Sequence, residues 1–150
     1  MQCVACVDTS IFLLDNGYQR STGQWKKVRR EALFRLDSAR KTWEQKQTLP
    51  TGDYTDTRMA SVQGQLLVAG GNKGTVAQYN PETGTWCTGN PPAFLHSNGA
   101  LVVHQQRVFL MGGFTEDHVE EYNLETKCWS VCDVRVPKGL TNIYAMALTF

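Results

Sequence analysis

Three side chains that can exchange protons or hold a metal ion follow one another at Glu116, Asp117 and His118. A carboxylate beside an imidazole can perform general acid–base chemistry or ligate a cation. One such tripeptide is more typical of a polar surface loop than of a catalytic site. The other histidines, His96 and His104, stand apart from it. We therefore predict a hydrogen-bonding cluster here, within a protein that is not an enzyme.

The cysteines offer a weak zinc motif. Cys3 and Cys6 form one pair and Cys128 and Cys132 another, and the two pairs lie more than 120 residues apart. Structural zinc sites use closely spaced pairs, and an odd total of five cysteines argues against a disulfide framework. We interpret them as small buried hydrophobes and predict no metal and no cofactor. The sequence also has no nucleophile elbow and no phosphate-binding loop.

A basic segment that contains a tryptophan lies at residues 18–32, which read YQRSTGQWKKVRREA. Residues 18–50 carry nine Lys or Arg against three acids, whereas the rest of the chain carries six against eleven. We predict a basic finger that grips an acidic segment of a protein partner. Its residues are Trp25, Lys26, Lys27, Arg29 and Arg30. A solvated loop is the alternative, and nucleic acid is the weaker reading because the remaining surface is acidic.

Composition sets the class of protein. Of 150 residues, 41% are hydrophobic and 19% charged, with a net charge of +1, which excludes a disordered charged tail and a global attraction to nucleic acid or anionic membranes. No apolar run reaches the roughly 18 to 20 residues that span a bilayer. Residues 1–14 lack a basic start and predict a strand, not a signal peptide. We expect a cytoplasmic protein, with nuclear or cytoskeletal sites as alternatives.

A repeat organises the whole chain. Trp43, Trp86 and Trp129 are spaced by 43 residues, in segments that read LDSARKTW (36–43), YNPETGTW (79–86) and YNLETKCW (122–129). An apolar run precedes each: IFLLDN (11–16), LLVAGG (66–71) and VFLMGG (108–113). Four short antiparallel strands in about 43 residues is the size of a propeller blade.

The repeat predicts an all-β fold of three four-stranded blades. They cover residues 2–50 (with an insertion at 18–32), 58–92 and 97–137, and residues 143–150 form one further closing strand. We expect Gly70-Gly71 and Gly112-Gly113 to take positive φ at the strand exits, with Asp15-Asn16 in that role in the first unit. The tryptophans, with Tyr79 and Tyr122, should pack between blades.

These motifs resemble the kelch repeat, which has Gly-Gly after an apolar strand, then Tyr, a turn containing Thr, and Trp. The second unit carries them at Gly70, Gly71, Tyr79, Thr83 and Trp86, and the third at Gly112, Gly113, Tyr122, Thr126 and Trp129. The first unit departs, with Leu36 in place of Tyr. The resemblance implies a ring of five to seven blades, of which this chain supplies half. We therefore expect self-association through the exposed blade faces. One form of it would be a six-bladed ring made of two copies.

The resemblance also implies that loops at one end of the blades bind a protein. The candidate residues there are Tyr18, Arg20, Trp25, Lys26, Lys27, Arg29, Arg30, Tyr54, Arg58, Asn72, Lys73, His96, Asn98, Phe114, Glu116, Asp117, His118 and Asn142. The BTB–kelch group, which recruits substrates to a Cullin-3 ubiquitin ligase, is the most similar in style, although blades account for all of these 150 residues. The alternatives are a cytoskeletal scaffold, a copper oxidase, and a truncated product without function.

Overall fold

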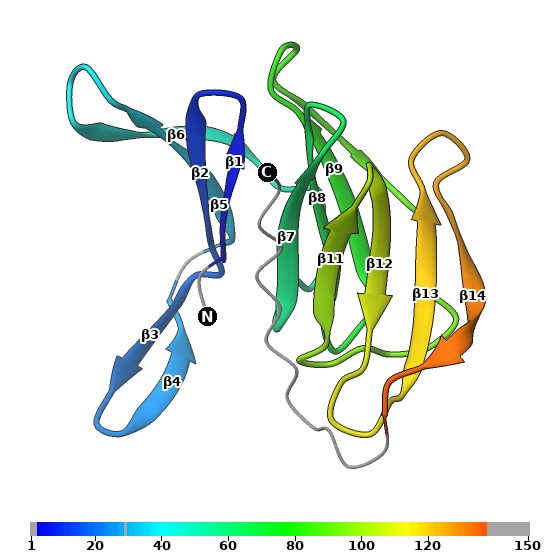
Figure 1. The fold of residues 1–150 in the computed structure, drawn as a ribbon. Coiled ribbons are helices and arrows are strands. Elements are labelled where there is room, and N and C mark those ends of the chain that lie inside the picture. Colours follow the sequence, from blue (N-terminus) through cyan, green and yellow to red (C-terminus); the bar gives the residue numbers. More distant parts are fainter. Residues whose placement is uncertain (1–2, 29, 138–150) are drawn as a thin grey trace.

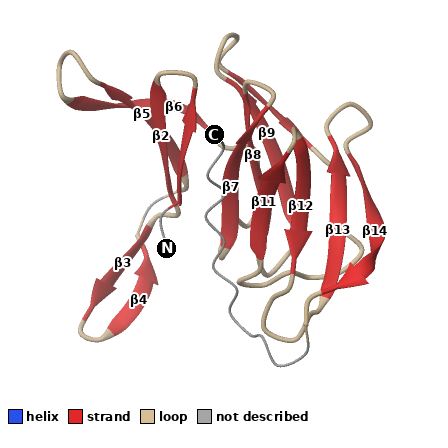
Figure 2. Ribbon diagram, in the orientation of Figure 1, coloured by secondary structure: helices blue, strands red, loops and turns tan. Residues whose placement is uncertain are grey.

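The computed structural model describes residues 3–28 and 30–137, and within them every regular element is a β-strand (Figures 1 and 2). Blade 1 contains β1 (Cys3–Val7), β2 (Ser10–Asp15), β5 (Ala32–Asp37) and β6 (Thr42–Thr48). Blade 2 contains β7 (Thr57–Val62), β8 (Gln65–Gly70), β9 (Thr75–Asn80) and β10 (Thr85–Thr88). Blade 3 contains β11 (Ala100–His104), β12 (Arg107–Met111), β13 (His118–Asn123) and β14 (Cys128–Arg135).

Within each blade the strands pair antiparallel in sequence order, which confirms the predicted architecture of three four-stranded blades. The remaining two strands, β3 (Tyr18–Ser21) and β4 (Gln24–Lys27), form a hairpin inserted between β2 and β5. The predicted closing strand at 143–150 lies outside the described residues. In the described part of the chain, no helix could cross a membrane.

Blade 2 has apolar side chains on both faces because it lies between two other sheets. One face, with Leu66, Val68 and Tyr79, joins the buried residues of blade 1 in a single core. The opposite face, with Leu67 and Val76, joins those of blade 3 in a second core. Alternate residues along a strand point to opposite faces, so the nearly continuous apolar run of β8 supplies both cores.

The tryptophan of a blade packs against the blade before it. The Trp86 indole N–H donates to the carbonyl of Gln47 at 3.2 Å, and that of Trp129 donates to the carbonyl of Asn90 at 2.9 Å. Their rings lie 5.0 and 4.8 Å from those of Tyr79 and Tyr122. This confirms the predicted inter-blade position for two of the three repeats.

The prediction is wrong for Trp43, whose side chain is 46% exposed. It lies on the face of blade 1 that points away from blade 2, and within the described residues no blade precedes it. The neighbouring sheet, and not the residue type, partly buries the other two tryptophans.

The turns between the third and fourth strands share one construction. The side-chain oxygen of Asn80 accepts the N–H of Glu82 at 2.9 Å, and Asp37 and Asn123 make the equivalent bonds in the other blades. Two residues before each tryptophan the backbone has positive φ, at Lys41, Gly84 and Lys127. An Asx side chain that holds its own turn explains why these positions keep the same geometry with different residues.

The strand exits require glycine for two reasons. Gly70, Gly71, Gly112 and Gly113 all have positive φ, as predicted. At Gly71 an added Cβ would also lie 2.3 Å from the Thr55 carbonyl oxygen, so the backbone itself leaves no room.

In blade 1 the prediction for Asp15-Asn16 is wrong, because Gly17 takes the positive φ of 74°. The side chains of Asp15 and Asn16 instead accept the N–H groups of Gly17 and Tyr18. Asp15 and Asn16 therefore stabilise the turn through their side chains, while their own φ angles stay negative.

Two glycine substitutions separate these effects. Gly84→Ala adds a Cβ with no atom closer than 3.9 Å, so we expect only the cost of positive φ, about 1 kcal/mol. Gly71→Ala adds a backbone collision to the same cost, so its loss of unfolding free energy should be clearly larger. Urea unfolding followed by tryptophan fluorescence measures both, and equal losses would contradict the close approach at Gly71.

Candidate partner-binding face

The connections at one end of the blades come together in space. They are the links from second to third strands (16–31, 71–74 and 112–117) and the links between blades (49–56 and 89–99), and we call this surface the loop face. Figure 1 shows the hairpin of β3 and β4 and the link from β12 to β13 at the same, lower end of the molecule. Loops held by a rigid scaffold are the usual place for binding residues.

A chain of hydrogen bonds crosses the loop face from blade 1 to blade 3. The hydroxyls of Tyr18 and Thr55 lie 3.4 Å apart, and the Asn72 N–H donates to the Thr55 carbonyl at 3.4 Å. The Ser97 hydroxyl donates to the Asn72 side chain, and the Phe114 N–H donates to the Ser97 carbonyl at 3.1 Å. Loops far apart in sequence therefore form one continuous surface.

The basic insertion is a β-hairpin and not an irregular loop. Its two-residue turn, Thr22-Gly23, has positive φ at both positions, which is the geometry that best joins two twisted strands. Ala32, assigned to the insertion from the sequence, already belongs to β5. β3 and β4 pair with each other in a separate two-stranded sheet, and this hairpin projects from the end of blade 1 as a defined arm (Figure 1).

The hairpin register divides the predicted basic residues between two faces. Arg20 lies opposite Trp25, and Tyr18 lies opposite Lys27, so these four share one face. Lys26 is on the other face, because successive strand residues alternate. A single partner segment therefore meets Lys26 or Lys27 and not both. Arg29 lies outside the described residues.

Lys27 already has partners. Its ammonium donates to the Glu31 carboxylate, which raises the pKa of Lys27, and it lies 5.9 Å from the centre of the Tyr18 ring. Its charge therefore holds the base of the hairpin. Arg20, Lys26 and Arg30 are exposed, and within the described residues we find no protein acceptor for their charged groups.

A hollow of about 430 Å³ lies between the hairpin and the link at residues 49–56. Its walls are mostly apolar and come from Asn16, Tyr18, Trp25, Thr55 and Asp56. The Trp25 side chain is 65% exposed at its rim. An exposed tryptophan beside an apolar hollow is a common feature of protein-binding surfaces, because a large ring adds contact area with few rotatable bonds.

Two predicted contact residues are buried and cannot touch a partner. Tyr54 is 2% exposed and donates its hydroxyl to the Pro50 carbonyl at 3.1 Å, and burial raises its pKa to about 12. His96 is 1% exposed. Both residues lie in the links between blades. The sequence predicted these loops correctly, but it could not predict that the two side chains point inward.

His96 forms a buried pair with Glu120. Its Nε2 lies 2.8 Å from the Glu120 carboxylate and its Nδ1 lies 2.7 Å from the Gly112 carbonyl oxygen. The carboxylate also accepts the N–H groups of Ala93 and Phe94 at 2.7 and 3.1 Å. The pair therefore fastens the link between blades 2 and 3 to β13.

Sequence reasoning missed Glu120 altogether. One signal was available, because Glu120 precedes Tyr122 by two and must share its inward face. A charged residue at an inward strand position indicates a buried partner.

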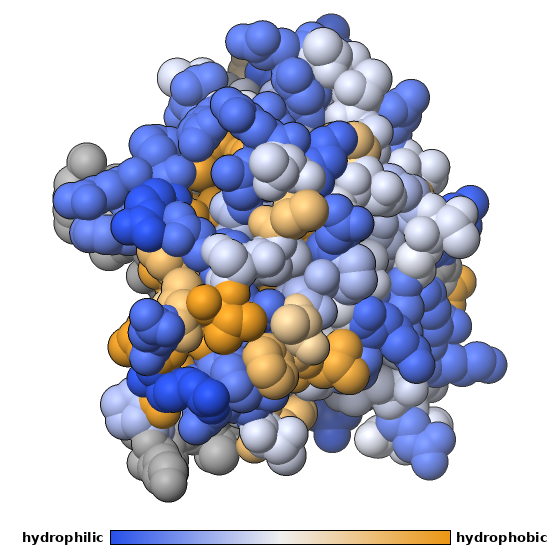
Figure 3. All heavy atoms as spheres, turned by 90° about the vertical axis from the view of Figure 1, so that its right-hand side faces the viewer, coloured by the Kyte–Doolittle hydropathy of each residue, from blue (hydrophilic) through white to orange (hydrophobic). Residues whose placement is uncertain are grey.

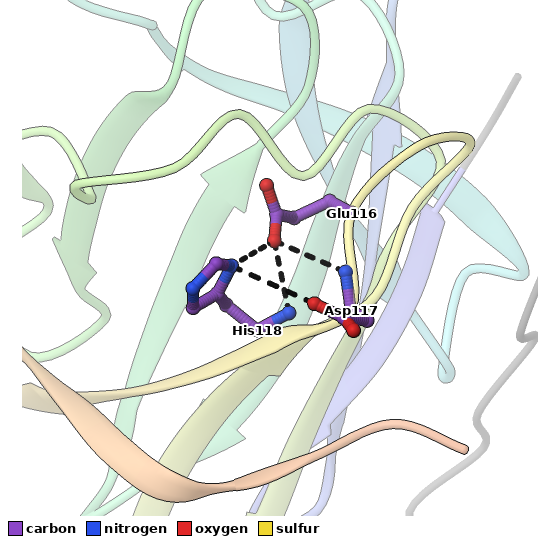
Figure 4. A group of neighbouring side chains, drawn as sticks. All are labelled: Glu116, Asp117 and His118. Atoms are coloured by element: carbon purple, nitrogen blue, oxygen red, sulfur yellow. Dashed lines mark hydrogen bonds and ion pairs between the residues drawn. The ribbon is translucent and has the colours of Figure 1, made fainter. Parts of the chain in front are cut away.

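The cluster Glu116–Asp117–His118 is a local hydrogen-bonded turn, as predicted (Figure 4). The Glu116 carboxylate accepts the N–H groups of Asp117 and His118 at 3.0 and 2.9 Å and contacts the His118 Nδ1. Asp117 binds Arg135 at 2.7 Å, and the His118 ring stacks on Phe94.

The same three residues bring ligand atoms within 4.8 Å of one another. This is the only group of three such ligand residues among the described residues. Each of its carboxylates is already engaged by protein groups, and nothing else at this position indicates a cation.

The remaining predicted residues occupy the loop face with different exposure. Asn72, Lys73 and Phe114 are exposed, and Arg58 donates to the Asn98 side chain at 3.4 Å across blades 2 and 3. Asn142 lies outside the described residues. Their contact with a partner stays a prediction.

Comparison with known proteins supports the repeat. Residues 96–133 match the family model of the Kelch motif, which covers most of blade 3. The fold is similar to the solved structure of YjhT, with 16% sequence identity and a TM-score of 0.71. The match covers 91% of this chain and 52% of that chain, so the protein spans about half the length of the structure it resembles. No curated protein matches its sequence.

The buried pair predicts a large effect of one substitution. Glu120→Ala removes the acceptor of three hydrogen bonds and leaves the His96 Nε2 without its partner inside the protein, so we expect a loss of about 3–5 kcal/mol in unfolding free energy. Glu121→Ala is the matched control, since its bonds to Arg107 are at the surface and should matter little. Urea unfolding compares the two, and similar losses would contradict the role of the pair.

Acid should weaken the turn at residues 116–118. Burial would raise the pKa of Glu116, but bonds from the His118 N–H and ring outweigh it and lower this pKa. The hydrogen bond from Arg135 lowers the pKa of Asp117. A lowered pKa gives stability that is complete above the unfolded value of about 4 and is lost as pH falls through the folded value.

We therefore expect the urea concentration at the unfolding midpoint to decrease as the pH is lowered below about 4. The decrease should be less steep in Glu116→Gln. Glu125→Gln, at an exposed turn, is the control and should follow the wild-type curve. An unchanged slope in Glu116→Gln would contradict the assignment.

Proposed function

We propose that the loop face binds a protein, and that the hairpin of β3 and β4 grips an acidic segment of that partner. One observation carries the proposal: the hairpin, residues 18–27, holds Arg20, Lys26 and Lys27 and no acidic residue, and it lies beside an apolar hollow. Kelch repeats, which residues 96–133 match, are generally protein-binding modules.

The chemistry of the hairpin defines the partner. Arg20 and Trp25 lie side by side on the face that borders the hollow. A guanidinium binds a carboxylate in two parallel hydrogen bonds, and an apolar hollow of this size accepts one large side chain. The ligand that fits is an extended segment with an apolar residue next to Asp or Glu.

Two settings for such a surface follow from the resemblance to kelch proteins. In a substrate adaptor of a Cullin-3 ubiquitin ligase, the loop face would hold the substrate. In a cytoskeletal scaffold it would hold a filament-associated protein. We propose the first, in the cytoplasm, where reduced conditions suit the five unpaired cysteines. Co-purification of Cullin-3 with this protein from cells would support the adaptor, and its absence would favour the scaffold.

Charge reversal on the two faces of the hairpin tests the binding mode. The probe is a fluorescent peptide with a central leucine flanked by glutamates, and binding is measured by fluorescence anisotropy. Arg20→Glu should weaken it at least about tenfold, because an ion pair next to the hollow becomes a repulsion. Lys26→Glu, on the opposite face, has the same change of charge and should weaken it about threefold or less through the general field.

Trp25→Ala should also weaken the peptide, while a peptide with glutamines in place of glutamates should bind poorly to every variant. Equal binding of the two peptides by the wild-type protein would contradict the acidic ligand. Equal effects of Arg20→Glu and Lys26→Glu would contradict the face assigned to it.

A further inference from the structure

Among residues 3–28 and 30–137, no strand covers one complete sheet face of blade 1. Val4, Ile11 and Trp43 on this face are 59%, 37% and 46% exposed. Leu13 and Leu36 beside them are only partly buried. Pairing of Val4 with Leu13 and of Leu36 with Trp43 places these residues on the same side of all four strands. In blades 2 and 3 the equivalent face packs on the blade before it.

The junctions inside the chain show how an equivalent face packs on the blade before it. Trp86 donates to the carbonyl of Gln47, which is four residues after Trp43. Trp129 donates to the carbonyl of Asn90, which is four residues after Trp86. At both junctions the indole therefore donates to the carbonyl four residues after the tryptophan of the preceding blade. By the same rule, Trp43 would need a preceding blade with a free carbonyl four residues after that blade's tryptophan.

Blade 3 offers that carbonyl at Asp133, four residues after Trp129. Its outer sheet face, the one turned away from blade 2, has Val102, Phe109 and Met111, which are partly exposed. Seen from the side of β14, apolar side chains gather in the lower half of the molecule, between hydrophilic ones (Figure 3). The same chain therefore carries both halves of the blade-to-blade contact, one at each end of its stack.

We infer that two copies of this chain join head to tail, with the Trp43 indole of one copy donating to the Asp133 carbonyl of the other. Each copy supplies one head and one tail, so a twofold axis gives two identical junctions and covers both outer faces of the three described blades. The lengths agree, because one chain covers 52% of the YjhT chain and two would match its whole extent. This inference is independent of partner binding at the loop face.

Light scattering after size-exclusion chromatography tests the inference. The wild-type chain should have twice its mass of 16.8 kDa. Trp43→Asp should give the single-chain mass, since a carboxylate would replace the indole at the centre of the junction. Trp25→Asp, at the other highly exposed tryptophan, introduces the same change on the hairpin and should leave the doubled mass. Circular dichroism and thermal melting verify that each variant is folded.

A mixing experiment distinguishes head-to-tail contact from pairing of two like faces. Phe109→Asp breaks the tail, as Trp43→Asp breaks the head, and each variant alone should be single. Mixed together they retain one intact head and one intact tail, so the doubled mass should return at high concentration. A single-chain wild type, a doubled Trp43→Asp variant, a mixture that stays single, or larger open assemblies would each overturn the closed two-copy ring.

Discussion

A β-sheet with apolar side chains on both faces is stable in water only where another layer covers each face, and this requirement determines the arrangement of the protein. The blade-to-blade contact meets it with one repeated set of partners. An indole donates to a carbonyl of the preceding blade, and the tyrosine beside it fills the same junction; Tyr122 also donates its hydroxyl to Gln78 at 2.7 Å. Blade 2 has both contacts, and its inner strands are accordingly buried on both sides.

The loop face depends on this stacking. Links that belong to different blades meet only because the sheets are held side by side, and their hydrogen bonds then join Tyr18 through Asn72 to Phe114. The buried pair of His96 and Glu120 adds a second fastening between blades 2 and 3. A rigid surface of this kind loses little conformational entropy when a partner binds, which favours affinity.

The inserted hairpin is the part of the surface that owes least to the blades. It pairs with itself and contacts the rest of the protein near its base, where Lys27 binds Glu31 and Tyr18 meets Thr55. Its strand register gives it two chemically different sides, one bordering an apolar hollow and one facing away. The basic residues therefore lie on two different faces of the hairpin, which a count of charges in the sequence cannot show.

The sequence by itself determined the repeat, the all-β class and the turn chemistry, because strand alternation, paired glycines and Asx turns are local properties that each segment carries alone. The position of the loops, with Asn72, Lys73 and Phe114 exposed on them, followed from the same repeat. Only the tertiary structure decided the burial of Tyr54 and His96, the partner of Glu120 and the exposure of Trp43. Burial is a property of the neighbouring sheet, and residues 24 or more apart in sequence become neighbours only through packing.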